Sequence, residues 1–336
     1  MTNIKEQKKY FKQNFPNLGK ILGIEKLKHD DINTENYKIS TTCGQYVLRN
    51  FKENSTREQI EKMCKILSYC VTKKAAVYEP IRNKSNRYVC TKNKIFVTKY
   101  YEGNIHNGNS EQLGNLAKHL AILHKILAKS RIKYPTDKTI ERSYEVLTAK
   151  EFDKIRKIIG LGRNGTDRFV LENIDYLRDC SEEDDKKSKV IAKRRFCKQL
   201  IHHDLHPGNV FFQKNKVNAI IDFNSMKKCY VMEDISFASF RFAVHCTSDR
   251  KMIKKRIRLF LDRYKQYGKF DGKQFEFFSY FLEHEFLRRI SYILRKWYLY
   301  QKHDESSWIE DLEKNMCFLR LVHDTNLLDG ISKKCT

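Results

Sequence analysis

The chain has 336 residues, of which 40% are hydrophobic and 12% aromatic, a composition that excludes a disordered protein and allows a substantial core. It has no stretch approaching the roughly eighteen uninterrupted apolar residues of a membrane span and no apolar core of a secretory signal, so we expect a cytoplasmic protein. The formal net charge of +25 is spread along the chain without a nucleic-acid-binding motif, which favours a basic solvated surface and argues against a nucleic-acid partner.

The N-terminal region predicts a small β-sheet with one helix. A basic helix precedes a strand near residues 21–24, and alternating apolar side chains predict further strands at 37–40 and 44–51. The sequence Asn-Ser-Thr at 54–56 offers good N-cap residues for a following helix. The apolar face of that helix comprises Ile60, Met63, Cys64, Leu67, Cys70 and Val71. Two more strands are expected near 87–91 and 94–100.

The remainder of the chain is predicted to be mostly helical. Residues 113–127 carry apolar side chains at helical spacing, and segments 150–159 and 168–177 show a similar pattern. The charged residues 180–187 are expected to form a solvated junction between helices, and residues 190–200 a helix. Residues 250–328 are helical by pattern as well.

One segment carries the strongest functional signal, LIHHDLHPGNVFFQKNKVNAIIDF, which runs from Leu200 to Phe223. The apolar runs VFF and VNAII are separated by the polar QKNK, which predicts a β-hairpin. Asp204 and Asn209 precede the first strand in a loop that Pro and Gly make tight, and Asp222 follows the second strand. The hairpin therefore brings two carboxylates and an amide to one end of a small sheet. These groups suffice to orient a hydroxyl and to hold Mg²⁺ on a triphosphate.

This segment resembles the phosphotransfer core of the aminoglycoside phosphotransferase, choline kinase and homoserine kinase superfamily, which are small-molecule relatives of protein kinases. The phrase His-x-Asp-Leu-His-Pro-Gly-Asn is complete from His202 to Asn209, and Ile-Asp-Phe follows around Asp222. The resemblance extends over about residues 20–245. A metal cluster of His202, His203, Asp204 and His206 and an inert polar turn are the alternatives. Neither alternative explains the spacing of Asn209 and Asp222.

The resemblance implies a bilobal, protein-kinase-like fold of the α+β class. Residues 1–100 would form the N-lobe, a small antiparallel β-sheet that binds the nucleotide. Residues 105–336 would form the larger, mainly helical C-lobe, with the catalytic loop and the substrate-binding helices. Residues 101–104 would be the hinge between them, where Tyr101 and its neighbours meet the adenine through backbone groups.

The resemblance also implies roles for residues of the catalytic loop and hairpin. Asp204 would accept a hydrogen bond from the attacking hydroxyl and take its proton late, while His202 shapes the loop. Asn209 and Asp222 would hold Mg²⁺ against the phosphates of ATP or GTP.

In the N-lobe, Arg49 stands late in a strand, where protein kinases carry a phosphate-binding Lys, and would grip the inner phosphates. Glu61 borders the apolar face of the next helix and is the expected carboxylate anchor for Arg49. The loop at 30–36 has no Gly, so backbone N–H groups together with Asn33 or Thr34 are expected to contact the phosphates.

The implied activity is Mg²⁺-dependent transfer of the γ-phosphate of ATP or GTP to a hydroxyl of a small molecule such as a sugar, amino acid, amino alcohol or antibiotic. Residues 223–233, between Asp222 and Asp234, leave no room for the activation segment of a protein kinase, and Asn224 replaces the Gly of its Asp-Phe-Gly motif. The positive charge disfavours a polycationic antibiotic. Aromatic residues in 275–300 suit either a helical core or a box around a quaternary ammonium group, as in choline kinases. A protein Ser/Thr kinase and a nucleic-acid-binding protein remain the alternative functions.

Overall fold

The computed structural model describes residues 4–331 except for 28–33, 52–55, 91–93, 135–144, 163, 269–271, 302–307, 326 and 329–330. The chain forms two compact units. Unit 1 comprises Met1–Pro135, Gln199–Lys228 and Leu259–Lys269, and unit 2 comprises Thr136–Lys198, Cys229–Arg258 and Phe270–Thr336. The segment that carries the predicted catalytic residues therefore belongs to the same compact unit as the N-terminal sheet.

A five-stranded antiparallel sheet forms the N-terminal part of unit 1, with the strand order β1-β2-β3-β5-β4. Its strands are β1 (Ile21–Lys26), β2 (Thr34–Thr41), β3 (Gly44–Phe51), β4 (Pro80–Ile81) and β5 (Ile95–Lys99). In the register of β2 and β3, Tyr37 lies opposite Leu48 and Asn36 lies opposite Arg49. Because successive side chains in a strand alternate between the two faces, these two pairs occupy opposite faces of the sheet.

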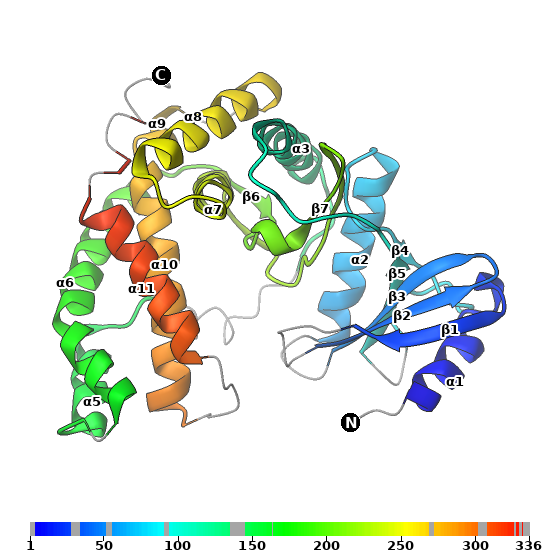
Figure 1. The fold of residues 1–336 in the computed structure, drawn as a ribbon, viewed down its shortest axis with the longest axis horizontal. Coiled ribbons are helices and arrows are strands. Elements are labelled where there is room, and N and C mark those ends of the chain that lie inside the picture. Colours follow the sequence, from blue (N-terminus) through cyan, green and yellow to red (C-terminus); the bar gives the residue numbers. More distant parts are fainter. Residues whose placement is uncertain are drawn as a thin grey trace. The chain divides into compact units, whose positions relative to one another are not determined.

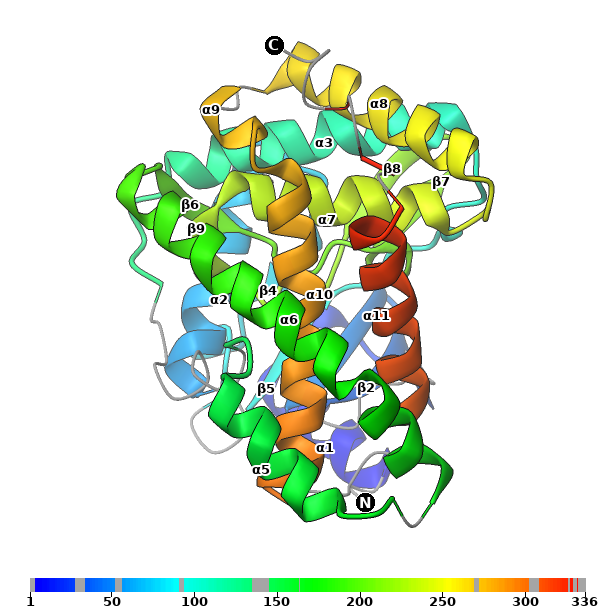
Figure 2. The same ribbon diagram turned by 90° about the vertical axis from the view of Figure 1, so that its left-hand side faces the viewer.

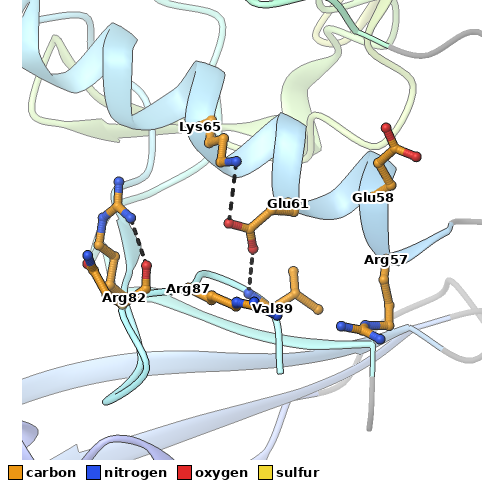
Figure 3. A pocket seen from close by; sticks show the side chains of 8 residues that line it. Arg57, Glu58, Glu61, Lys65, Arg82, Arg87 and Val89 are labelled. Atoms are coloured by element: carbon orange, nitrogen blue, oxygen red, sulfur yellow. Dashed lines mark hydrogen bonds and ion pairs between the residues drawn. The ribbon is translucent and has the colours of Figure 1, made fainter. Parts of the chain in front are cut away.

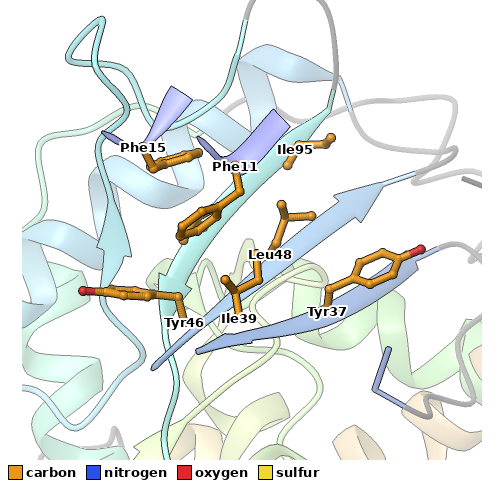
Figure 4. Close-up of a cluster of buried hydrophobic side chains, with 8 residues drawn as sticks. Phe11, Phe15, Tyr37, Ile39, Tyr46, Leu48 and Ile95 are labelled. Carbon is orange, nitrogen blue, oxygen red and sulfur yellow. The ribbon is translucent and has the colours of Figure 1, made fainter. Parts of the chain in front are cut away.

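The predicted N-terminal helix is confirmed as α1 (Ile4–Asn14), which covers one face of this sheet (Figure 1). Phe11 and Phe15 stack with their ring centres 5.5 Å apart and share a buried cluster with Tyr37 and Leu48 (Figure 4). The short 3₁₀ turn η1 (Pro16–Leu18) links α1 to β1. Burying side chains of this size contributes roughly 1.5–3 kcal/mol each, so this cluster fixes α1 to the sheet.

Helix α2 (Arg57–Thr72) begins at the predicted N-cap. The Thr56 hydroxyl accepts the backbone N–H of Gln59, and the Gln59 side chain accepts the N–H of Thr56, a complete capping box. The helix buries Ile60, Met63, Cys64, Ile66, Leu67 and Cys70, and it packs beside β4 (Figure 1). The predicted helix and most of its apolar face are confirmed.

The strand predicted at 87–91 is wrong, since residues 87–90 form no strand and the short β4 takes its place. The Asn83 side chain accepts two backbone N–H groups of the turn that follows β4. The N–H groups of Tyr88 and Val89 then donate to the Glu61 carboxylate. Side chains thus satisfy the backbone here in place of a neighbouring strand.

The predicted hairpin is confirmed as β7 (Val210–Gln213) and β8 (Lys216–Ile220), with Val210 opposite Ile220. The 3₁₀ turn η2 (Pro207–Asn209) precedes it, and helix α3 (Ser110–Ala128) packs against β8. Strands β6 (Lys198–Ile201) and β9 (Lys227–Tyr230) form a second two-stranded sheet.

Two backbone connections tie the hairpin to other segments of unit 1. Ile220 donates to the carbonyl of Ala76 at 2.8 Å and accepts from the N–H of Tyr78 at 3.2 Å. Asn104 and Phe212 exchange two backbone hydrogen bonds, of 2.9 and 2.8 Å. The segment after α2 and the segment after β5 therefore both pair with the hairpin.

Unit 2 is mainly helical. Its elements, together with α8, which spans both units, are α5 (Ala149–Ile159), α6 (Gly165–Lys193), α7 (Val231–Val244), α8 (Arg250–Tyr267), α9 (Gly272–Phe275), α10 (Phe278–Leu294), the π-helical turn η3 (Arg295–Leu299) and α11 (Trp308–His323). Helix α10 packs against α6 and α11 (Figure 2). Within the described residues, no helix has the length and apolar character needed to cross a membrane. The sheet and the helical remainder confirm the predicted α+β class.

Two helix boundaries in unit 2 differ from the prediction. The charged segment 180–187 lies in the middle of α6 and is not a junction, and the helix expected over 190–200 ends at Lys193. Ser181 donates to the carbonyl of Leu147 at 2.6 Å, and Asp184 lies 2.8 Å from a ring nitrogen of His284. Polar side chains in the middle of α6 therefore have partners on neighbouring segments, which stabilises the helix there.

We predict that Gly103→Ala destabilises the protein by about 1–3 kcal/mol. A Cβ atom at Gly103 would stand 2.8 Å from the backbone oxygen of Phe212, so the pairing of Asn104 with β7 would have to shift. Gly23→Ala is the matched control, because a Cβ there meets nothing within 4 Å. Thermal unfolding of both variants checks this, and equal melting temperatures would contradict the close approach at Gly103.

Candidate active site

His202 connects the catalytic loop to the end of β8. It is completely buried, its Nε2–H donates to the carbonyl of Ile221 at 2.8 Å, and its Nδ1 accepts the N–H of Asp204 at 3.2 Å. Both bonds require the neutral tautomer with the proton on Nε2. The imidazole therefore fixes the backbone of Asp204 relative to the residue that precedes Asp222.

The carboxylate of Asp204 lies at the edge of this loop, with its side chain 23% exposed. The His206 Nδ1 accepts the N–H of Gly208, so the proton of a neutral His206 resides on Nε2, which lies 3.9 Å from Asp204 Oδ2. Partial exposure leaves Asp204 accessible to a small molecule, and its neighbour His206 presents a donor toward it.

Asn209 is held close to Asp222 by two hydrogen bonds. Its side chain donates from Nδ2 to the carbonyl of Asp204 at 2.9 Å, and its backbone carbonyl accepts the N–H of Ile221 at 2.9 Å. Asn209 Oδ1 takes no hydrogen bond from the described residues. Asp222 follows Ile221 directly with φ 61°, a left-handed conformation that costs of order 1 kcal/mol in a non-Gly residue.

An amide oxygen and a carboxylate are hard donors, and Mg²⁺ commonly takes one or two such ligands and completes its octahedron with phosphates and water. The donor chemistry of Asn209 and Asp222 therefore fits Mg²⁺ on a nucleotide. Among the residues that the structure describes, no group of three or more His, Cys, Asp and Glu side chains is placed to hold a metal. The histidine-rich cluster considered from the sequence consequently has no support.

Phe223, the residue after Asp222, packs against two rings of this site. It is completely buried, and its ring centre lies 4.5 Å from that of His202 and 5.8 Å, edge to face, from that of Tyr78. Tyr78 is 1% exposed and follows the segment that pairs with β8. These aromatic contacts leave little freedom to the backbone on either side of Asp222.

Arg49 of β3 lies on the sheet face opposite to α1 and is 8% exposed. Its guanidinium carbon lies 5.1 Å from the centre of the Tyr78 ring, and its Nε has no hydrogen-bond partner among the described residues. Asn36, its neighbour on β2, is 4% exposed and has an Oδ1 in the same situation. Leaving a buried polar atom unpaired costs about 1–3 kcal/mol, so two such atoms on facing residues require an explanation.

Of the loop predicted at 30–36, residues 34–36 belong to β2, and residues 30–33 lie outside the described part of the chain. Thr34 is buried at the start of that strand, and Asn33 lies outside the described residues. Asn36 was not selected from the sequence. The signal available there was the two-residue alternation, which continues from Tyr37 backwards and places Asn36 on the face opposite to the apolar residues.

Glu61 has partners other than the one expected, and no ion pair with Arg49 is formed among the described contacts. One carboxylate oxygen accepts the N–H groups of Tyr88 and Val89, and the other lies 4.0 Å from Lys65 (Figure 3). Glu61 borders a polar pocket of about 560 Å³, lined also by Arg57, Glu58, Lys65, Arg82, Asn86, Arg87 and Val89. Without Glu61, the N–H groups of Tyr88 and Val89 would have no acceptor, because this segment does not pair with a neighbouring strand.

Tyr101 follows β5 and is half-buried. Burial raises the pKa of its hydroxyl, and the charge of Glu79 adds to this effect. The predicted contact of this segment with adenine runs through backbone groups and stays a prediction. The aromatic residues expected as a possible ammonium box are largely core, since Phe278 and Phe281 are buried and Trp297 stacks on Trp308 at 4.0 Å.

The sequence matches the model of the phosphotransferase enzyme family over residues 24–270. The chain belongs to this family. The phosphotransferase is 23% identical to a homoserine kinase of Methylobacillus flagellatus over 252 residues, which cover 74% of this chain and 71% of that protein.

Solved structures share the fold of this phosphotransferase. The amicoumacin kinase hAmiN, in complex with AMP-PNP, Ca²⁺ and Ami, aligns with a TM-score of 0.67 and 15% identity over 100% of this chain and 98% of that one. The choline kinase LicA of Streptococcus pneumoniae aligns with a TM-score of 0.60 and 15% identity over 94% and 98%. The protein-kinase-like fold predicted from the sequence is therefore confirmed.

We predict that Glu61→Ala lowers the free energy of unfolding of the phosphotransferase by about 1–2 kcal/mol, because the backbone N–H groups of Tyr88 and Val89 lose their acceptor. Its affinity for nucleotide should stay within about twofold of wild type, since Glu61 does not hold Arg49. Glu58→Ala is the control on the same pocket, where the exposed carboxylate pairs with Lys62 at 2.6 Å and little change is expected. Chemical denaturation and calorimetry check both quantities; a large loss of nucleotide affinity in Glu61→Ala alone would restore the original assignment.

Proposed function

We propose that the protein transfers the γ-phosphate of ATP to a hydroxyl group of a small molecule in a Mg²⁺-dependent reaction. The observation that carries this proposal is the grouping of Asp204, Asn209 and Asp222 at one end of the β7–β8 hairpin. A backbone hydrogen bond from Ile221 to Asn209 and a bond from the His202 imidazole to the carbonyl of Ile221 hold that group together.

In phosphoryl transfer, the protein mainly positions the reactants and neutralises the charge of the phosphates. Asp204 accepts a hydrogen bond from the acceptor hydroxyl and receives its proton as the new P–O bond forms and the bond to the leaving ADP breaks. Asn209 Oδ1 and the Asp222 carboxylate hold Mg²⁺, which neutralises charge on the phosphate oxygens when bound. Arg49 adds a positive charge that is not compensated by a carboxylate among its described contacts.

The acceptor is proposed to be a small hydroxylated molecule, with hydroxy amino acids and amino alcohols as the first candidates. A homoserine kinase is similar in sequence over 74% of this chain and 71% of its own length, which supports this choice. After Asp222 the chain enters β9 at Lys227 and α7 at Val231, so no long segment is available for docking a protein substrate. The excess of 25 positive charges also disfavours a polycationic acceptor.

A coupled ADP-release screen tests this proposal. The panel contains homoserine, serine, choline, ethanolamine, sugars, nucleosides and aminoglycosides, each with ATP or GTP and with or without Mg²⁺. We expect Mg²⁺-dependent release of ADP with at least one small acceptor and little phosphate transfer to casein or histone. Transfer to proteins without turnover of any small molecule would favour the alternative of a protein kinase.

We predict that Asp204→Ala lowers turnover by at least about 10²-fold while nucleotide affinity stays near wild type, because the lost carboxylate contacts the acceptor and not the nucleotide. Steady-state kinetics with the acceptor from the screen, together with calorimetry on Mg-ATP, separate the two effects. Turnover close to wild type would remove Asp204 from the reaction.

Asp222→Ala should abolish the Mg²⁺-dependent part of nucleotide binding, and Asn209→Ala should weaken it less, since a charged ligand contributes more than an amide. Calorimetric titration with ATP in the presence of Mg²⁺ or EDTA measures that part. Asp179→Ala, which removes an exposed carboxylate from α6, is the control and should bind as wild type does. Unchanged Mg-ATP affinity in Asp222→Ala would exclude the proposed metal site.

A further inference from the structure

The face of the N-terminal sheet opposite to α1 carries a polar pair that the proposed mechanism only half uses. Asn36 on β2 and Arg49 on β3 are direct neighbours in the antiparallel register. Tyr37 and Leu48, one position along, face the cluster under α1 (Figure 4). Asn36 and Arg49 therefore project together on the other face, where Asn36 is the direct neighbour of the proposed phosphate ligand Arg49.

Both side chains are almost fully buried, with exposed fractions of 4% and 8%, and each has a buried atom without a hydrogen-bond partner among the described residues. Buried polar atoms are nearly always hydrogen-bonded in native proteins. Two neighbouring buried atoms without partners therefore destabilise the fold unless a bound molecule supplies the missing hydrogen bonds. Arg49 Nε offers a donor. The Asn36 amide offers a second donor after a rotation that exchanges Oδ1 and Nδ2. Two donors on facing strands match the oxygens of a phosphate.

Tyr78 fixes the guanidinium of Arg49 without neutralising it. The ring lies 5.1 Å below the guanidinium carbon, a cation–π contact, while its backbone N–H is bonded to Ile220. A carboxylate partner would lower the affinity of Arg49 for an anion, whereas an aromatic face leaves the full charge available. Tyr78 therefore orients the positive charge and leaves it free to act on an anion.

The same tyrosine places this pair near the expected metal site. Burial raises the pKa of the Tyr78 hydroxyl, the charge of Arg49 opposes this shift, and the charge of Asp222 adds to it. The Tyr78 ring lies 5.1 Å from the guanidinium carbon of Arg49 and 5.8 Å from the ring centre of Phe223, the residue that follows Asp222.

We propose that Asn36 and Arg49 together bind the phosphates of the nucleotide, and that Tyr78 is the positioning residue that holds Arg49 for this purpose. The proposal rests on the proposed function, since it names further residues of the same nucleotide site. Asn36 acts by direct contact with phosphate oxygen. Tyr78 acts only through Arg49.

Calorimetric titration of Mg-ATP and of adenosine into wild type, Asn36→Ala and Asn50→Ala tests the role of Asn36. Asn50 is the matched control, an asparagine of the same sheet that stands next to Arg49 on the opposite face of β3. We expect Asn36→Ala to weaken ATP binding by at least about tenfold and to leave adenosine binding within about twofold, with no effect of Asn50→Ala.

Equal ATP affinity in wild type and Asn36→Ala overturns the assignment of Asn36 while leaving the proposed function intact. A wild-type protein that binds neither ATP nor GTP removes the proposed function, and this inference with it. Equal losses for ATP and adenosine in Asn36→Ala also overturn the assignment, because the effect would then not involve the phosphates.

The role of Tyr78 is tested by Tyr78→Phe and Tyr78→Leu, each alone and combined with Arg49→Met. Tyr78→Phe keeps the aromatic face and should bind ATP within about threefold of wild type, whereas Tyr78→Leu should lose at least about tenfold. In the Arg49→Met background, Tyr78→Leu should cost less than about twofold further, because the residue acts through Arg49. An equal loss in both backgrounds would show that Tyr78 is merely structural. Melting temperatures of all variants verify folding, and the conservative Tyr78→Phe keeps the test decisive if Tyr78→Leu unfolds.

Discussion

The candidate active site depends on the backbone of two residues at the end of β8 and directly after it, Ile220 and Ile221. Ile220 is hydrogen-bonded to the segment that follows α2, through Ala76 and Tyr78. Ile221 donates to the carbonyl of Asn209 and accepts from the buried His202. The distant segment after α2 and the nearby loop from His202 to Asn209 are therefore both joined to the two residues that precede Asp222. Since these bonds are buried and paired, displacing any one of them would leave unsatisfied groups, which makes the placement of Asp222 rigid.

Some of the unfavourable features of the fold lie near this junction. His203 and Asp222 have φ values of 69° and 61°, in the left-handed region that non-Gly residues seldom adopt. Asn36 and Arg49, on neighbouring strands of the N-terminal sheet, each contribute a buried atom that has no hydrogen-bond partner among the described residues. Each such feature costs of order 1–3 kcal/mol, and stable proteins retain them mainly where binding or chemistry requires them. These four residues belong to the same compact unit as the sequence motif.

The sequence predicted those parts of the site that depend on local order. The hairpin follows from two apolar runs and a polar turn, and the spacing of Asp204, Asn209 and Asp222 follows from the hairpin. Asn36 and Tyr78 were missed because their importance comes from cross-strand register and from packing between distant segments, which no local pattern encodes. Glu61 was misassigned for the same reason, since its true partners are backbone groups of a segment that was predicted to be a strand.

The central claim is that Asn209 and Asp222 hold the metal ion that binds the nucleotide phosphates. A crystal structure of the protein with Mg²⁺ and AMP-PNP tests it most directly. The account predicts one or two cations bonded to phosphate oxygens, with the Asp222 carboxylate and Asn209 Oδ1 at about 2.0–2.1 Å from a cation. A nucleotide whose metal ion is coordinated by other side chains, with Asp222 and Asn209 outside the coordination sphere, would contradict it.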